Sequence, residues 1–148
     1  MHMQQYHNST SARWLGFAGV LPFAITAVNL HSGWPLFDGF ALQVFIIYSA
    51  VILSFLGGIR WGLAARIEAS PASEYVIAIA PSLIAVAAVL LPRPGWVVLA
   101  LAAGFAATGL VDYLRPAGMP TWLHNLRWQL TLLVISMHAL AWLAIRNW

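Results

Sequence analysis

Arg60, Asp112 and Arg127 stand inside long apolar stretches of the sequence, where charged side chains are rare and usually pair with one another. A carboxylate between two guanidiniums can accept charge-assisted hydrogen bonds from both. Two arginines and one acid leave an excess positive charge, which can bind an anion such as a lipid phosphate or a substrate carboxylate. We therefore treat these residues, together with Arg115, as a candidate charged cluster that contacts an anion or a lipid.

The elements that carry these residues are apolar segments long enough to cross a membrane. Of 148 residues, 61% are hydrophobic and 7% are charged, too few charges to cover a soluble domain. A spanning helix needs about 20 mostly apolar residues. The sequence predicts an all-α membrane protein, a bundle of five transmembrane helices joined by short loops. A polar tail at 1–12 precedes a single domain at 13–148, with helices at 13–30, 40–67, 72–91, 95–114 and 121–145.

Counting along these helices places the charged residues in one layer. At a rise of about 1.5 Å per residue, Arg60 lies about 30 Å along its helix, Asp112 about 26 Å and Arg127 about 9 Å. Because successive helices alternate in direction, all three fall near the same membrane surface. Two simpler arrangements stay open. Asp112 can pair with Arg115 in its own helix, and Arg60 can extend to lipid phosphates at the surface.

Small residues recur every four positions along the second predicted helix. Ala50, Ser54, Gly58 and Gly62 share one face and include the GxxxG pattern that lets membrane helices approach closely. Arg60 lies nearly opposite Gly58 on the helix. Either this helix has neighbours on both faces, or Arg60 faces outward. The pattern predicts tight helix packing, within the chain or between copies.

Polar residues also lie along one face of the last predicted helix, at 121–145. Thr131 and His138 continue the face of Arg127, and such a stripe can line a proton or solute path or simply bond to neighbouring helices. His31 and His138 fall near the opposite surface, where two histidines could ligate a haem. No ligand spacing supports that site. We predict no metal and no cofactor, with haem or quinone as the alternative.

The arginines outside the helices bear on orientation and partners. They are scattered singly, so we expect no nucleic-acid partner, and membrane lipids are the expected contacts. The positive-inside rule favours a cytoplasmic N-terminus, because one side would carry more arginines than the other. The first side would carry Arg13, Arg66 and Arg115, and the other Arg93 and Arg146.

Four stretches carry a resemblance to a known family. They are LGFAGVLPF (15–23), YSAVILSFLGGIRWGLA (48–64), APSLIAVAAVLLP (80–92) and LRWQLTLLV (126–134). Nearly the whole chain resembles an uncharacterised domain-of-unknown-function family of small bacterial membrane proteins, which also includes the mitochondrial transmembrane protein sixty-nine. The resemblance implies a helical protein of the bacterial inner membrane and no established activity.

The sequence favours a role outside catalysis. It holds no cysteine and matches no metalloprotease, serine hydrolase or nucleotide-binding motif. Short loops and small-residue packing favour an accessory, assembly or scaffold subunit, either in a homo-oligomer or in a larger membrane complex. A small oligomeric transporter or channel and a lipid-, quinone- or haem-binding subunit are the alternatives.

Overall fold

The computed structural model describes residues 2–32, 37, 39–116 and 118–146, with the backbone alone for 2–9. These residues form helices and no strand. The helices are α1 (His2–Ala18), α2 (Leu21–Ser32), α3 (Ala41–Ala64), α4 (Ala72–Val89), α5 (Pro94–Leu114) and α6 (Thr121–Ile145). Five segments are long and apolar enough to cross a membrane, the first of them Thr10–Ser32, which combines α1 and α2. The predicted fold class is confirmed.

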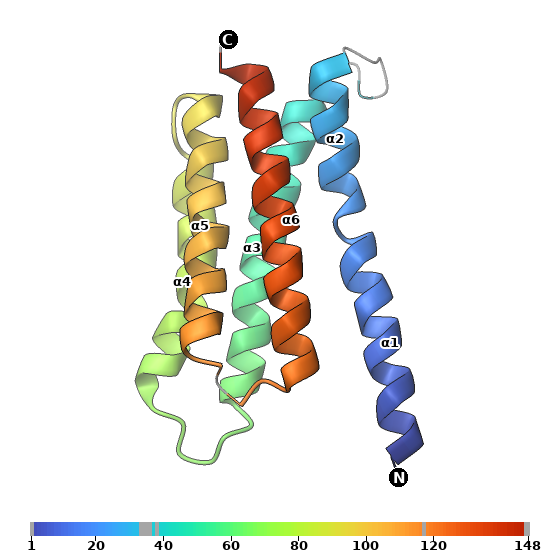
Figure 1. Cartoon of the computed structure of the whole chain (residues 1–148). Helices are drawn as coiled ribbons and strands as arrows, with labels where there is room; N and C mark the ends of the chain where they lie inside the picture. Colours follow the sequence, from blue (N-terminus) through green and yellow to red (C-terminus); the bar gives the residue numbers. More distant parts are fainter. Residues whose placement is uncertain (1, 33–36, 38, 117, 147–148) are drawn as a thin grey trace.

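The spans run side by side along one direction, and the described chain begins and ends at opposite ends of the bundle (Figure 1). The α3–α4 and α5–α6 connections lie at the end where α1 begins, and the α4–α5 turn lies at the other end. α3 packs against α2, α4 and α5, while α6 packs against α1, α2 and α5. α3 thus has neighbours on more than one face.

A break divides the first span, where the sequence predicts one helix at 13–30. Pro22 has no N–H group, and its ring would crowd the carbonyl of Ala18, four residues earlier. α1 ends at Ala18, and α2 begins at Leu21, so Pro22 occupies a first-turn position. The Tyr48 hydroxyl of α3 donates a hydrogen bond of 2.8 Å to the Gly19 carbonyl. A neighbouring helix therefore satisfies a backbone group at the break.

Other helix ends differ modestly from the prediction. The expected polar tail at 1–12 is helical from His2 onward. α3 ends at Ala64 instead of residue 67, because the backbone tightens to three-residue hydrogen bonds, from Arg66 N–H to the Leu63 carbonyl and from Ile67 N–H to the Ala64 carbonyl. α6 has the predicted bounds, Thr121–Ile145.

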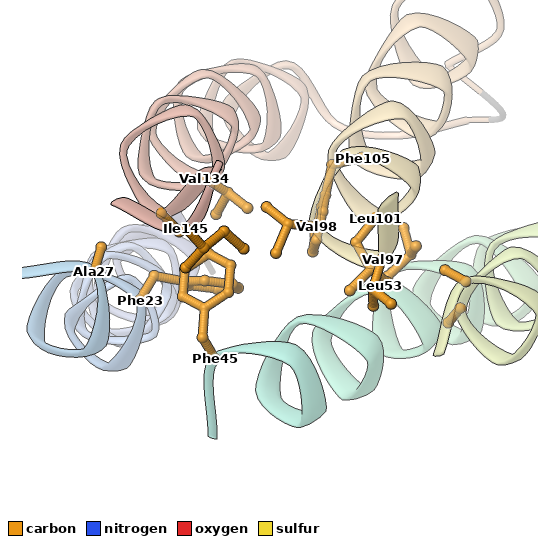
Figure 2. Close-up of a cluster of buried hydrophobic side chains, with 13 residues drawn as sticks. Phe23, Ala27, Phe45, Leu53, Val97, Val98, Leu101, Phe105, Val134 and Ile145 are labelled. Carbon is orange, nitrogen blue, oxygen red and sulfur yellow. The ribbon is translucent and has the colours of Figure 1, made fainter. Parts of the chain in front are cut away.

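The buried core lies where α2, α3, α4, α5 and α6 meet (Figure 2). Phe23, Phe45 and Phe105 come from three different helices and are nearly inaccessible. The Phe23 ring meets the other two edge to face, with centroids 5.7 and 6.1 Å apart. This aromatic cluster joins the first span to the rest of the bundle.

Candidate functional site

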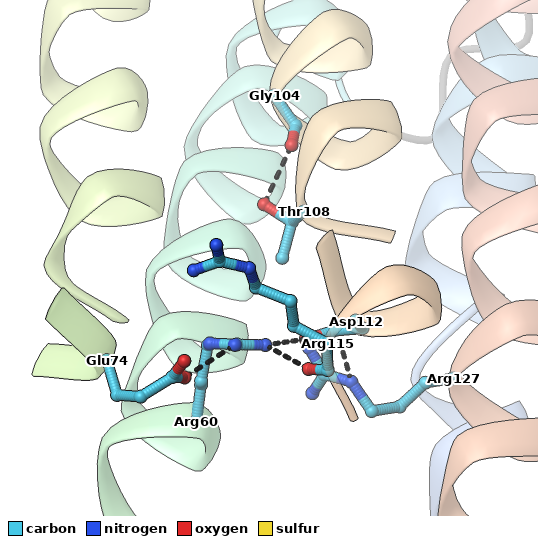
Figure 3. Close-up of polar contacts among 7 residues, drawn as sticks. All are labelled: Arg60, Glu74, Gly104, Thr108, Asp112, Arg115 and Arg127. Carbon is cyan, nitrogen blue, oxygen red and sulfur yellow. Dashed lines mark hydrogen bonds and ion pairs between the residues drawn. The ribbon is translucent and has the colours of Figure 1, made fainter. Parts of the chain in front are cut away.

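Arg60 reaches from α3 into the bundle and binds two neighbouring helices (Figure 3). It is 2% exposed. Its Nη1 donates to Asp112 Oδ1 at 3.1 Å and to the Arg115 carbonyl oxygen at 3.0 Å. Its Nη2 donates to Glu74 Oε2 at 2.7 Å. One guanidinium thus connects α3 with the first turn of α4 and the end of α5.

Asp112 is shared between two arginines. Its second oxygen, Oδ2, accepts from Arg127 Nε at 2.8 Å and also from Arg127 Nη2. Asp112 is 4% exposed and Arg127 is 6% exposed. The structure therefore brings together the three residues that the sequence places in one layer. Asp112 is bonded to both arginines, which is the cluster arrangement rather than local pairing with Arg115 or extension of Arg60 to lipid.

Glu74 is the member that the sequence analysis missed. It lies in the first turn of α4, and its side chain is 17% exposed. The depth count that grouped the other residues also applies to it, because α4 starts at the same end of the bundle. With Glu74, two arginines face two carboxylates, so the formal charge of these four side chains is zero rather than positive.

Arg115 contributes its backbone instead of its side chain. It is the C-cap residue of α5, where helix carbonyls lack partners within the helix, and its own carbonyl accepts from Arg60. Its side chain is exposed. Within the described part of the chain, Asp112 forms ion pairs with Arg60 and Arg127 and not with Arg115.

The small-residue stripe faces away from the bundle only at its Gly58 and Gly62 end. Gly58 and Gly62 are exposed, and a Cβ at either position would meet nothing within 4 Å. Ala50 and Ser54 are half-buried. The close approach within the chain is at the neighbouring Gly57, where a Cβ would collide with a backbone carbonyl of α4. Packing of the predicted stripe against another copy or another protein stays a prediction.

Thr131 and His138, the polar stripe predicted on α6, are both buried, but they lie in different surroundings. Thr131 lies against Gly109 of α5, where an added Cβ would be 2.7 Å from the threonine methyl group. His138 is 1% exposed, and its Nδ1 donates to the Val134 carbonyl at 2.8 Å. The rings of Phe23, Phe45 and Phe105 lie 4.8 to 5.7 Å from the imidazole. An aromatic layer therefore surrounds His138.

The two histidines considered for haem occupy different surroundings. His31 is exposed, and its Nε2 donates to the Leu140 carbonyl at 2.9 Å, which joins the end of α2 to α6. His138 is enclosed by phenylalanines, and its Nε2 has no hydrogen-bond partner among the described residues. Neither histidine lines the cavities described below. Within the described ranges, no three metal-ligating side chains are grouped.

Two cavities flank the charged cluster. The larger, of about 400 Å³, lies between the first span, α3 and α6, and its wall includes Arg127 and Thr131. The smaller, of about 150 Å³, lies between α3, α4 and α5, and its wall includes Arg60 and Asp112. Arg60 Nε and Arg127 Nη1 are buried and have no acceptor in the part of the chain that the structure describes. The cluster therefore retains two buried donors without an acceptor among the described residues.

Comparison with known proteins identifies the family. No match is found among curated proteins or among solved structures. The family model described as "Protein of unknown function (DUF3429)" matches residues 8–143. This range includes Arg60, Glu74, Asp112 and Arg127, and it covers all five candidate spans except the last two residues of the fifth. The chain is a helical membrane protein that belongs to the DUF3429 family.

Proposed function

We propose that this protein is a non-catalytic accessory subunit that docks a transmembrane helix of a partner, or of a second copy, on the outward face of α3. The proposal rests on the uncovered Gly58 and Gly62. Small residues on a lipid-facing surface allow another helix backbone to approach closely, and packing of this kind drives helix association in membranes. A helix face with large side chains would contact lipid equally well, but it would keep the backbone of a second helix at a distance.

The charged cluster supports a structural role. Each of its arginines is bonded to carboxylates of other helices, which fixes the register of α3, α4, α5 and α6. A rigid bundle presents α3 in one orientation, as a docking surface requires.

The transporter alternative is less well supported by the same geometry. A solute path along α6 would need polar or open space from Thr131 to His138. Phe23 and Phe105 line the large cavity and also pack against His138, so aromatic rings close the cavity on that side.

Mild purification tests the docking proposal. Two differently tagged copies are expressed together and solubilised gently, and the material captured through one tag is identified by mass spectrometry. We expect a stoichiometric partner, either the second copy or another membrane protein, that is lost in Gly58→Leu and Gly62→Leu. Ala106→Leu, at an exposed position on α5, is the matched control and should retain it. Equal retention in all three variants would refute the proposal.

We further propose that the N-terminus is cytoplasmic and that the membrane is the bacterial inner membrane. The absence of native cysteine makes single-cysteine labelling clean. Glu68→Cys, in the α3–α4 connection, should react with an impermeant maleimide only after the cells are opened. Pro92→Cys, in the α4–α5 turn, should react in intact cells that have a permeable outer membrane. The reverse labelling pattern would show that the N-terminus lies on the opposite side of the membrane.

A further inference from the structure

We propose that the cavity of about 400 Å³ is a slot for one acyl chain of a phospholipid, which enters sideways from the membrane leaflet nearer the charged cluster. The inference concerns a different surface from the Gly58 and Gly62 face of α3 and does not depend on the docking proposal. It rests on the shape of the cavity, on its apolar wall and on the side to which it opens.

The cavity is elongated along the helix axes. On each of α1, α3 and α6, the residues that line it recur at the spacing of a single helix face. On α3, for example, they are Ile52, Phe55, Leu56 and Ile59. Since three helix faces border the space lengthwise, it has the form of a slot, which suits an extended chain better than a compact solute.

The slot is about as deep as one membrane leaflet. Its wall on α6 extends from Leu123, in the second half of the first turn, to Val134, a distance of about 17 Å at a rise of about 1.5 Å per residue. Half of a hydrocarbon core of about 30 Å is about 15 Å. At the inner end, Phe23 and Phe105 line the slot, and their rings pack edge to face. A chain whose head group stays at the membrane surface therefore matches the slot in length.

The wall of the slot favours hydrocarbon over water or a polar head group. Its two polar side chains, Arg127 and Thr131, are largely buried. Arg127 uses Nε and Nη2 to bind Asp112, and its Nη1 has almost no accessible surface. Thr131 lies against Gly109 of α5. A water molecule needs several polar partners, whereas an acyl chain supplies the dispersion contacts that apolar side chains around such a space would otherwise lack.

The slot opens sideways to the membrane. Leu15 and Phe55 line it and are 74% and 62% exposed, so its mouth lies between α1 and α3 on the outer surface of the bundle. Because the candidate spans are apolar, the solvent of that surface is the bilayer, whose chains reach the mouth without crossing the core. Ala12 lines the outer end on α1, and the next residue, Arg13, is exposed. A guanidinium at this level can pair with the phosphate of the lipid whose chain occupies the slot.

Photocrosslinking in a bilayer tests whether a chain occupies the slot. The purified protein is reconstituted into nanodiscs that contain a phosphatidylcholine with a diazirine midway along one acyl chain, and adducts are mapped by peptide mass spectrometry after illumination. Leu130 and Ile52 line the slot, whereas Leu132 and Val51 are exposed on the same helices at nearly the same depth. We expect more adduct at the two slot positions than at the two exposed positions, because a resident chain stays beside them. Equal or lower labelling of the slot positions would overturn the proposal.

Native mass spectrometry identifies the occupant. The protein is extracted from membranes with a mild detergent and analysed without added lipid. We expect one phospholipid to be retained per protein. A retained quinone, a retained hydrocarbon or a protein without any bound lipid would each contradict the assignment.

Variants locate the retained phospholipid in the slot. Leu130→Trp from α6 and Ile59→Trp from α3 each fill the space, and both should lose the phospholipid and the adduct at Ile52. Leu132→Trp, at an exposed position on α6, is the matched control and should keep both. Circular dichroism and size-exclusion chromatography establish that each variant is folded, and the adduct pattern of the wild type tests the slot even where a variant is not. Retention of the phospholipid by both filled variants would place it elsewhere and refute the site.

Discussion

Removal of the Asp112 carboxylate should destabilise the protein more than removal of the Glu74 carboxylate. Asp112 accepts three hydrogen bonds from two guanidiniums and is 4% exposed. In Asp112→Ala, Arg127 loses both of its ion-pair bonds, whereas Arg60 keeps Glu74 and the Arg115 carbonyl. Breaking a buried pair from one side leaves a buried charge without compensation, at a cost of about 3 to 5 kcal/mol.

Glu74→Ala should have a smaller effect. It removes one hydrogen bond, and the Glu74 side chain is already 17% exposed, so lipid headgroups and water can replace it. We expect a loss of about 1 kcal/mol. Arg115→Ala is the matched control, because it removes an exposed side chain and keeps the carbonyl that Arg60 uses. Its unfolding free energy should equal that of the wild type.

The free energies can be measured by reversible unfolding of the purified protein in mixed micelles of a mild detergent and dodecyl sulfate. A double variant sharpens the test: Asp112→Ala with Arg127→Met removes both partners, so its loss should be smaller than the sum of the single losses by about 1 to 3 kcal/mol. Additive losses, or a Glu74→Ala loss that equals the Asp112→Ala loss, would show that the carboxylate is not shared in the membrane.

Three further changes test local contacts by the same unfolding measurement. Tyr48→Phe should cost about 1 kcal/mol, because it removes the donor to the Gly19 carbonyl at the helix break; an unchanged stability would mean that another group satisfies this carbonyl. Gly57→Ala should cost about 1 to 3 kcal/mol through overpacking against α4, whereas Gly58→Ala should cost nothing; equal effects would place the wrong glycine at the contact. His138→Phe should preserve or raise stability by removing a buried unpaired nitrogen, whereas a clear loss would indicate a bound partner.

The spans and the charged layer could be predicted from the sequence because both depend on distance along a helix. Apolar length fixes the number of crossings, and the rise per residue fixes depth to within about one turn. Arg60, Asp112 and Arg127 could therefore be grouped before any packing was known. Glu74 was left out because an acid in a first helical turn is ordinarily solvated, and only the length of the Arg60 side chain brings it into the cluster.

The side of α3 that packs against the bundle could not be predicted, because it depends on which of two adjacent glycines contacts α4. Successive residues of a helix differ by about 100° in direction, so Gly57 and Gly58 point to different neighbours. The GxxxG pattern selects Gly58 and Gly62, whereas the α4 backbone lies against Gly57. The effect of the two prolines inside predicted spans could not be predicted either. Pro22 lies in the first turn of α2, directly after a helix break, whereas Pro81 lies inside α4, and the local sequence does not distinguish these two outcomes.

The position of the large cavity follows from how the ion pairs are distributed among the helices. Glu74, Arg60, Asp112 and Arg127 join α3, α4, α5 and α6 at one end of the bundle, and α1 contributes no residue to this set. α1 meets α6 at Gly16, and the first span is attached further along through Tyr48 and the phenylalanine rings around Phe23. Space therefore remains between α1 and α3 at the level of Arg127, which lines the large cavity. The same ion pairs that fix the four helices thus leave α1 outside their set, and the large cavity lies beside α1.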